Sequence, residues 1–212
     1  MRALVVFTAL ALTGCSKPSS NRELDHDLIR VTSDARLRTD MVGEGKWEAL
    51  STFVLVDAEN TTKQGAYVSL AGDLVDETGA KIGAFKPQSL WVPAGAVRTF
   101  ALIDSERKPR PTARGAQIFV RGAKTGLAPP AHVVDVKQVK DGDRVILQGA
   151  LKNDAARPGN IVVIASFYGA DGRPMTRPFS LLWVDGNGSL PVQFVGPAGS
   201  ARGNIYIGDA AY

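Results

Sequence analysis

The stretch Gly159-Asn-Ile-Val-Val-Ile-Ala165 is the most informative in the chain, because a related stretch, Gly65-Ala-Tyr-Val-Ser-Leu-Ala71, stands in the first half. In both stretches at least every second residue is apolar, and this period of two is typical of a β-strand. Each leads into a strand end and an acidic turn closed by glycine, at residues 74–79 and 167–172. The pattern predicts two similar segments built from short β-strands.

Two further blocks recur in the same order. Ser89-Leu-Trp-Val-Pro-Ala-Gly95 corresponds to Leu181-Leu-Trp-Val-Asp-Gly-Asn-Gly188, each a strand with a central Trp and a closing Gly turn. Residues 114–120 correspond to residues 201–207, a last strand in each copy. The offset between matched positions changes only from 94 to 87 residues along the chain, as expected for duplicated domains that differ by loop insertions.

Strand-like runs also precede these blocks, at residues 28–32, 36–41, 51–57, 132–139 and 144–152. Each copy then contains about six or seven short strands, the number found in an antiparallel sandwich of immunoglobulin-like type. We therefore predict an all-β fold of two tandem immunoglobulin-like β-sandwich domains that follow a cleaved signal peptide.

The domain boundaries are expected to follow composition. Residues 124–131 contain a glycine and two prolines and are interpreted as the interdomain linker. The expected division is a signal peptide at 1–14, a tether at 15–27, a first domain at 28–123 and a second domain at 132–212.

In the second copy a strand ends in Phe167-Tyr168 and runs into Asp171-Gly172, with Asn153 in a preceding loop. This pattern resembles the small extracytoplasmic FxLYD-type domains of bacterial lipoproteins, chiefly over residues 131–212. The first copy departs from it, with residues 73–75 (Asp-Leu-Val) where the aromatic residues would stand. The resemblance implies a β-sandwich with a non-catalytic role.

The first residues have the pattern of a secretory signal. Arg2 precedes an apolar run of ten residues, 3–12, which is too short to span a bilayer as a helix. The following Leu12-Thr13-Gly14-Cys15 resembles the bacterial lipobox, in which a lipid is attached to the cysteine and the chain is cleaved before it. An ordinary signal peptide that happens to contain a cysteine is the alternative.

The lipobox resemblance implies a diacylglyceryl thioether on Cys15 and an acylated amino group. Several buried acyl chains make such an anchor stable, so the membrane is the first expected partner. Ser16 follows the cysteine, which by the usual sorting rule implies the outer membrane, on its periplasmic or surface face. Residues 16–22 are small and polar, as suits a tether.

Composition excludes several classes of protein. The hydrophobic content of 44% and charged content of 22% are those of an ordinary globular protein. A formal charge of +4 is small and scattered, so no nucleic-acid partner is expected. With Cys15 the single cysteine, an intramolecular disulfide cannot form. The oligomeric state is left open.

The sequence contains no recognisable catalytic machinery. His26 and His132 lack the companion motifs that a zinc site or a Ser-His-Asp triad requires. The acidic segments 141–143 and 185–188 fit hairpin turns better than calcium loops, since a twelfth-position Glu is missing. We expect a protein that is not an enzyme and that carries no cofactor or metal.

Trp91 and Trp183 occupy equivalent places in the two copies and are candidate interaction residues. Leu90 and Val92 alternate with Trp91, which predicts that Trp91 points away from the face that they share. In one interpretation each Trp is structural, packed in the core or under a loop. In the other, it is a surface aromatic that contacts a partner, the other domain or a glycan.

Residues 105–114 form a loop that is about seven residues longer than its counterpart in the second copy. It carries Arg107, Lys108 and Arg110 together with two prolines. A basic loop of this kind either binds an anionic lipid, lipopolysaccharide or a protein, or is simply solvated.

These expectations favour a membrane-anchored envelope lipoprotein that acts as a binding or scaffold subunit of a larger cell-envelope assembly. The alternative is an accessory ligand-binding lipoprotein that recognises cell-wall glycan or another envelope ligand. A hydrolase with an unrecognised site is a third class. Edge strands of the predicted sandwiches are a further place where a partner strand could add.

Overall fold

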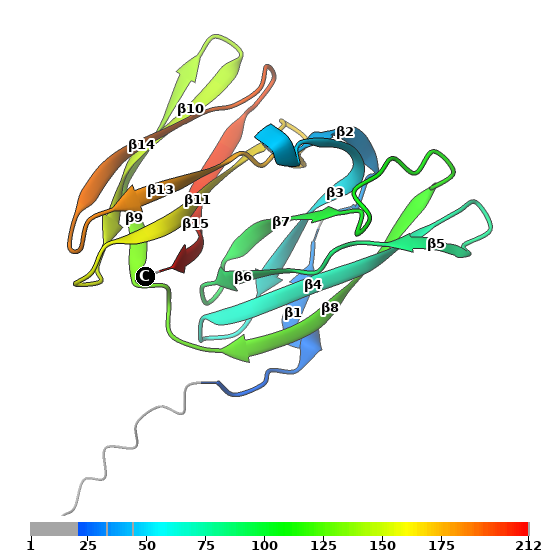
Figure 1. Cartoon of the computed structure of the whole chain (residues 1–212), viewed down its shortest axis with the longest axis horizontal. Helices are drawn as coiled ribbons and strands as arrows, with labels where there is room; N and C mark the ends of the chain where they lie inside the picture. The colour runs from blue at the N-terminus through cyan, green and yellow to red at the C-terminus, as the bar shows by residue number, and fades with distance from the viewer. Residues whose placement is uncertain (1–20, 33, 44, 212) are drawn as a thin grey trace, which may run out of the picture.

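The computed structural model describes residues 21–32, 34–43 and 45–211, and this part of the chain is all-β, with 62% strand and antiparallel sheets (Figure 1). Its helical residues form two single 3-10 turns, η1 (His26–Leu28) and η2 (Gly45–Trp47). The predicted signal peptide and Cys15 lie outside the described residues. Within the described residues no helix has the length and apolarity needed to cross a membrane.

The N-terminal half forms two sheets around central strands β3 and β4. In one sheet β3 pairs with β1 and β2 along one edge and with β7 along the other. In the second sheet β4 pairs with β5 and β6 along one edge and with β8 along the other. The bounds are β1 (Ile29–Val31), β2 (Arg38–Val42), β3 (Ala49–Asn60), β4 (Ala66–Val75), β5 (Lys81–Ala84), β6 (Gln88–Val92), β7 (Val97–Ile103) and β8 (Gly115–Thr125).

The C-terminal half repeats this pairing. β10 lies between β9 and β14, as β3 lies between β2 and β7. β11 pairs with β12 and β13 along one edge and with β15 along the other, as β4 does with β5, β6 and β8. The bounds are β9 (Ala131–Asp141), β10 (Arg144–Asn153), β11 (Gly159–Tyr168), β12 (Pro174–Thr176), β13 (Phe179–Val184), β14 (Ser189–Val195) and β15 (Arg202–Ala211).

Each half buries its own hydrophobic cluster between two sheets. In the C-terminal half the alternate residues Ile161, Val163, Ala165 and Phe167 of β11 are fully buried and pack against Leu147 of β10. In the N-terminal half the corresponding positions are Val54, Val56, Val68, Leu70 and Leu74. The period of two predicted from the opening stretch is therefore realised in both central strands.

The register of the strands corrects the sequence match by one residue. Gly159 pairs with Val184 and Ala66 pairs with Val92, so the counterpart of Gly159 is Ala66 and not Gly65. A one-residue slip exchanges the two faces of a strand. The expected match of Gly65 with Gly159 was wrong because both stretches are apolar at so many positions that either phase looks acceptable.

A buried asparagine closes the same corner in each half. Asn60 Nδ2 donates to the carbonyl oxygens of Gln64 at 2.8 Å and Val92 at 3.0 Å. Asn153 Nδ2 donates to the carbonyl oxygens of Arg157 at 3.1 Å, Val184 at 3.3 Å and Asp185 at 3.0 Å. Each asparagine therefore ties the end of one sheet's central strand to the end of a strand in the opposite sheet.

The two halves are joined by packing as well as by the chain. Ile164 and Tyr206, on the outward face of the β11 sheet, are buried in the N-terminal hydrophobic cluster. Figure 1 shows the β11 sheet lying between the β10 sheet and the N-terminal half. The Arg38 guanidinium in β2 donates to the carbonyl oxygens of Pro174, at 2.5 Å, and Met175.

The ordered structure extends into segments that we expected to be tether and linker. Leu24 N donates to Ala123 O at 2.9 Å, and Thr125 N donates to Arg22 O at 2.9 Å. Residues 22–24 are thus bonded to β8, and the connection between β8 and β9 is reduced to residues 126–130.

Candidate functional site

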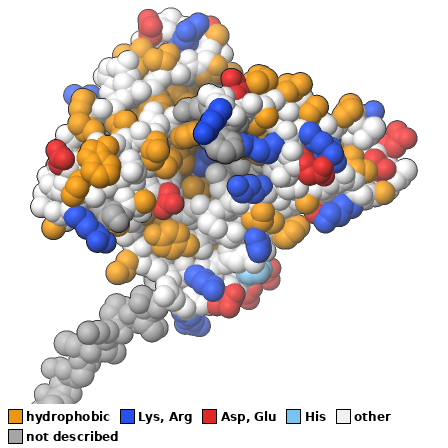
Figure 2. Space-filling view, viewed as in Figure 1, with side chains coloured by type: hydrophobic (Ala, Val, Ile, Leu, Met, Phe, Trp, Pro, Cys, Tyr) orange, Lys and Arg blue, Asp and Glu red, His pale blue; other side chains and the backbone are white. Residues whose placement is uncertain are grey.

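The second predicted tryptophan lies in an exposed apolar stripe. Phe179, Leu181 and Trp183 alternate along β13 with exposed fractions of 43%, 60% and 58%, opposite the buried Val184. We call these three residues the β13 stripe. β13 pairs with β11 along one edge, and the described strands place none along its other edge. Figure 2 shows hydrophobic side chains gathered on this region of the surface.

The first predicted tryptophan also lies on an outward sheet face but is partly covered. Trp91 pairs across the strands with Tyr67, and the two ring centroids are 5.3 Å apart at an interplanar angle of 58°. The indole lies directly over Gly65, where an added Cβ would approach it to 2.1 Å. Trp91 therefore rests on its own sheet, whereas Trp183 offers its side chain to solvent.

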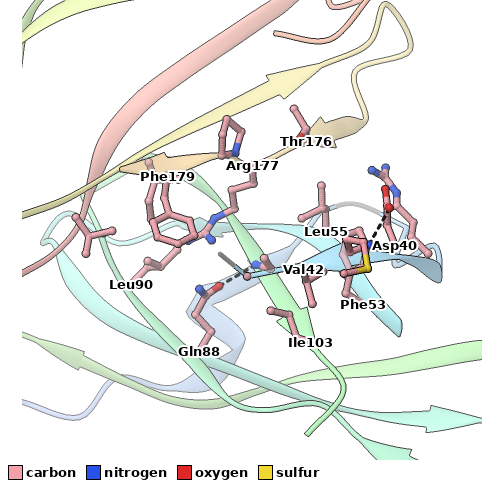
Figure 3. A pocket seen from close by; sticks show the side chains of 18 of the residues that line it. Asp40, Val42, Phe53, Leu55, Gln88, Leu90, Ile103, Thr176, Arg177 and Phe179 are labelled. Carbon is pink, nitrogen blue, oxygen red and sulfur yellow. Dashed lines mark hydrogen bonds between the residues drawn. The ribbon is translucent and has the colours of Figure 1, made fainter. Parts of the chain in front are cut away.

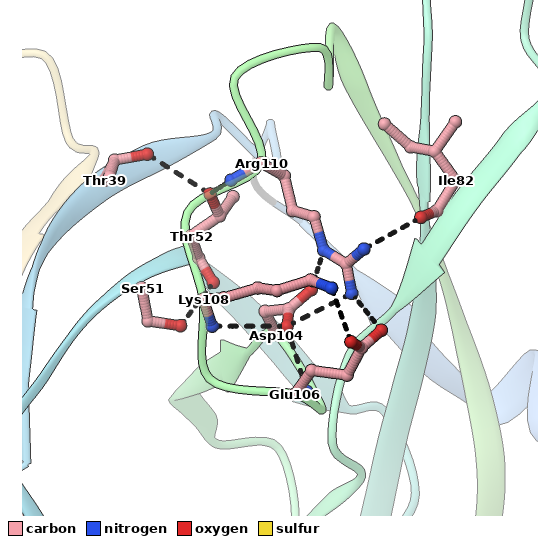
Figure 4. Close-up of polar contacts among 8 residues, drawn as sticks. All are labelled: Thr39, Ser51, Thr52, Ile82, Asp104, Glu106, Lys108 and Arg110. Carbon is pink, nitrogen blue, oxygen red and sulfur yellow. Dashed lines mark hydrogen bonds and ion pairs between the residues drawn. The ribbon is translucent and has the colours of Figure 1, made fainter.

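The basic loop has its central arginine turned inward (Figure 4). Arg110 Nε donates to Asp104 Oδ2 at 2.6 Å, and its Nη1 donates to Ile82 O at 3.2 Å. The Asp104 side chain is fully buried, and that of Arg110 is 12% exposed. The hydrogen bonds that Arg110 donates to Asp104 and then to Glu106 raise the pKa of Arg110. This residue is thus engaged within the fold rather than displayed to a partner.

The other two basic residues of the loop are on the surface. Lys108 is half-exposed and pairs with Glu106 at 2.5 Å. Arg107 is exposed and has a φ of +54°, in the left-handed region. Of the three predicted contact residues in this loop, these two remain accessible.

A buried polar network lies at the junction of the halves, and no pattern in the sequence indicated it. Tyr168 Oη and Thr99 Oγ1 are 2.8 Å apart, and Thr99 Oγ1 donates to Asp57 Oδ1 at 2.7 Å. Tyr206 Oη donates to Thr99 O at 2.8 Å, and the guanidinium of Arg202 stacks 3.9 Å over the Tyr168 ring. Buried polar side chains of the two halves are therefore hydrogen-bonded to each other across the junction.

The burial of this junction changes the pKa values of Asp57 and Tyr168. Burial raises the pKa of Asp57, against the lowering effects of the Thr99 hydroxyl, the Arg202 charge and the Tyr168 hydroxyl. Burial, followed by the charge of Asp57, raises the pKa of Tyr168 to about 12.

Asp57 is expected to make stability depend on pH. The pKa of Asp57 in the folded protein lies above the unfolded value of 3.8. The stability that Asp57 contributes is therefore fully present below pH 3.8 and is lost as the pH rises through the folded pKa. The unfolding free energy of the native protein minus that of Asp57→Asn should therefore fall as the pH rises from about 4 to 7. Urea denaturation at several pH values measures this difference.

Asp76→Asn is a control of opposite sign. The Thr78 hydroxyl lowers the pKa of Asp76, so the stability that Asp76 contributes is present above 3.8 and lost as the pH falls. Equal pH profiles for the native protein and Asp57→Asn would contradict the role assigned to Asp57.

A groove of about 660 Å³ runs along the junction (Figure 3). Strands of both halves line it, so no single stretch of sequence could have revealed it. Its apolar wall is formed by Phe53, Leu55, Leu90, Ile103, Ile164 and Phe179. Its charged members are Arg38, Asp40, Arg177 and Asp209. The groove borders the β13 stripe, since Phe179 belongs to both.

The histidines take surface positions in the described structure. His132 Nδ1 lies 2.6 Å from Asp154 Oδ2, in a pair of which both members are about half-exposed. His26 is exposed in η1. Among the residues that the structure describes, no three His, Cys, Asp or Glu side chains gather to hold a metal ion.

Comparisons with known proteins leave the family open. No protein-family model matches the sequence, and no curated protein matches it either. Among solved structures, a β-glucuronidase from glycoside hydrolase family 2 is similar at a TM-score of 0.29 and 12% identity, covering 76% of this chain and 21% of that protein. Red sea bream transglutaminase is similar at a TM-score of 0.24 and 13% identity, covering 80% of this chain and 27% of that one. The chain thus spans under a third of either protein, and neither likeness bears on its activity.

Proposed function

We propose that this chain is a non-enzymatic, lipid-anchored envelope protein whose two tandem immunoglobulin-like sandwiches bind a protein partner of a cell-envelope assembly through the β13 stripe. The anchor is the lipobox cysteine, Cys15, at the outer membrane. The matching strand order of the two halves and the shared Asn60 and Asn153 corners support descent from one duplicated domain.

The exposed β13 stripe is the observation that carries the binding role. Three large apolar side chains in a row on an edge strand are uncommon on a monomer and mark an interaction surface. The outward face that holds the stripe also supplies Ile164 and Tyr206, which already pack against another domain. The stripe is the part of this face that the N-terminal half leaves open.

Trp183 gives specific support to the alternative, a glycan ligand. An indole that is 58% exposed on a sheet face is a suitable platform for a sugar ring. In that case the stripe would bind purified peptidoglycan in the absence of any protein partner.

The test is co-purification of the full-length, membrane-inserted protein with its cross-linked neighbours. Leu181→Ser combined with Trp183→Ser should abolish a defined cross-linked protein band that the native chain yields. Leu127→Ser is the matched control, because Leu127 is 79% exposed in the connection between the halves. Unchanged cross-linking in the double variant would overturn the proposed site, and retention on peptidoglycan alone would favour the glycan alternative.

A further inference from the structure

Arg177 lines the groove, and one of its guanidinium nitrogens has no partner in the described part of the fold. Arg177 Nη2 is buried and has no hydrogen-bond partner among the described residues. The Nε of the same side chain donates to Tyr206 Oη at a long 3.4 Å. A buried charged donor without an acceptor is costly, so it marks a place where an acceptor from outside is expected.

Apolar and polar residues share the groove wall with Arg177. Figure 3 shows the Arg177 side chain with Phe179, Leu90 and Gln88 around the same part of the groove. The Gln88 side chain is already used, since its Oε1 accepts from Ala101 N at 2.8 Å. The other groove arginine, Arg38, is also used, by two carbonyl oxygens of the opposite half. Arg177 is therefore the cation that is left for a ligand.

We propose that this groove binds a small single-chain amphiphile whose carboxylate pairs with Arg177 and whose alkyl part lies along Leu55, Leu90 and Ile164. A groove of 660 Å³ is in the size range of small-molecule sites and has the usual composition, an apolar wall with a few polar groups.

The charges of the groove favour a monoanion. Asp40 and Asp209 also line it, and they would repel a dianion such as a phosphate monoester more strongly than a monoanion. A carboxylate carries one charge and matches the planar guanidinium edge with two parallel acceptors. A carboxylate that pairs with the Arg177 guanidinium supplies the acceptor that it lacks.

The test uses octanoate, 1-octanol and butyrate as probes, with calorimetry on the full chain. Octanoate should bind with a sub-millimolar Kd. 1-Octanol should bind about tenfold more weakly, because it loses the charge-assisted hydrogen bonds. Butyrate should bind about a hundredfold more weakly or worse, because it lacks four methylenes and each buried methylene tightens binding about fourfold.

Three variants test whether the probes bind in the groove. Arg177→Met keeps the apolar packing and should weaken octanoate about tenfold while leaving 1-octanol unchanged. Ala101→Phe narrows the groove and should weaken both probes. Arg173→Met is the matched control, because Arg173 lies outside the groove and pairs with Asp34 at 3.1 Å.

Equal affinity for octanoate and 1-octanol, or octanoate binding that survives Ala101→Phe, would overturn the proposal. Should Arg177→Met not fold, Arg177→Lys keeps a charge there and is expected to bind octanoate more weakly than the native chain, because an ammonium group lacks the planar fork.

Discussion

Arg110→Ala is expected to lower the free energy of unfolding by about 3 kcal/mol, because it leaves the fully buried carboxylate of Asp104 without its cation. The carboxylate keeps backbone donors at Glu106 N, 2.9 Å away, and Lys108 N, 3.4 Å away, so the loss stays near the lower end of the range for a broken buried ion pair. The guanidinium also links the loop to Ile82 O in β5, and this link is lost as well.

Chemical denaturation measures the loss, with Arg107→Ala as the control. Arg107 stands in the same loop with an exposed side chain, so its removal should change stability by less than about 0.5 kcal/mol. Asp104→Asn together with Arg110→Ala should recover part of the loss, since the uncompensated charge is gone. If Arg110→Ala were as stable as Arg107→Ala, the structural role of this arginine would be refuted.

Asn153→Ala is expected to cost about 3 kcal/mol, and Asn60→Ala a similar amount, because each removes a buried amide that satisfies several backbone groups. Asn153 Oδ1 also accepts from Ala155 N at 3.0 Å, and Asn60 Oδ1 accepts from Thr62 N at 3.1 Å. Truncation leaves these donors and the carbonyl oxygens at strand ends without partners inside the fold.

Thermal and urea unfolding of the two variants provide the measurement, beside the exposed Asn204→Ala as control. Losses of similar size in Asn60→Ala and Asn153→Ala would show that the two corners are energetically equivalent. A loss below about 1 kcal/mol in both would mean that water replaces the asparagine at little cost, contrary to our expectation.

The local β-structure could be predicted from the sequence because it depends on neighbouring residues. Alternation along β4 and β11 and the Gly-containing turns gave strands, turns and the antiparallel all-β class. The placement of Trp91 on the face opposite Leu90 and Val92 followed from the same period, and the structure has Leu90 and Val92 buried.

Other features depend on contacts between distant residues. The inward turn of Arg110 requires Asp104 and Ile82 to converge, and a basic loop in sequence has no mark that separates a bound arginine from a free one. The junction network joins Asp57 to Tyr168, 111 positions away, and the groove combines strands of both halves. The alignment of Gly65 with Gly159 failed for a related reason, since only the strand register fixes the phase.

The burial of Ile164 and Tyr206 in the N-terminal cluster has a consequence for how the molecule tolerates division. If cleavage within residues 126–130 separated the two halves, each would expose a surface that is now buried. The C-terminal half would expose the apolar Ile164, and the N-terminal half would expose the carboxylate of Asp57. The two halves are therefore expected to unfold as one cooperative unit and not as two independent modules. Because Ile164 and Tyr206 lie in the N-terminal cluster, a substitution at this junction in one half changes the packing of the other half as well.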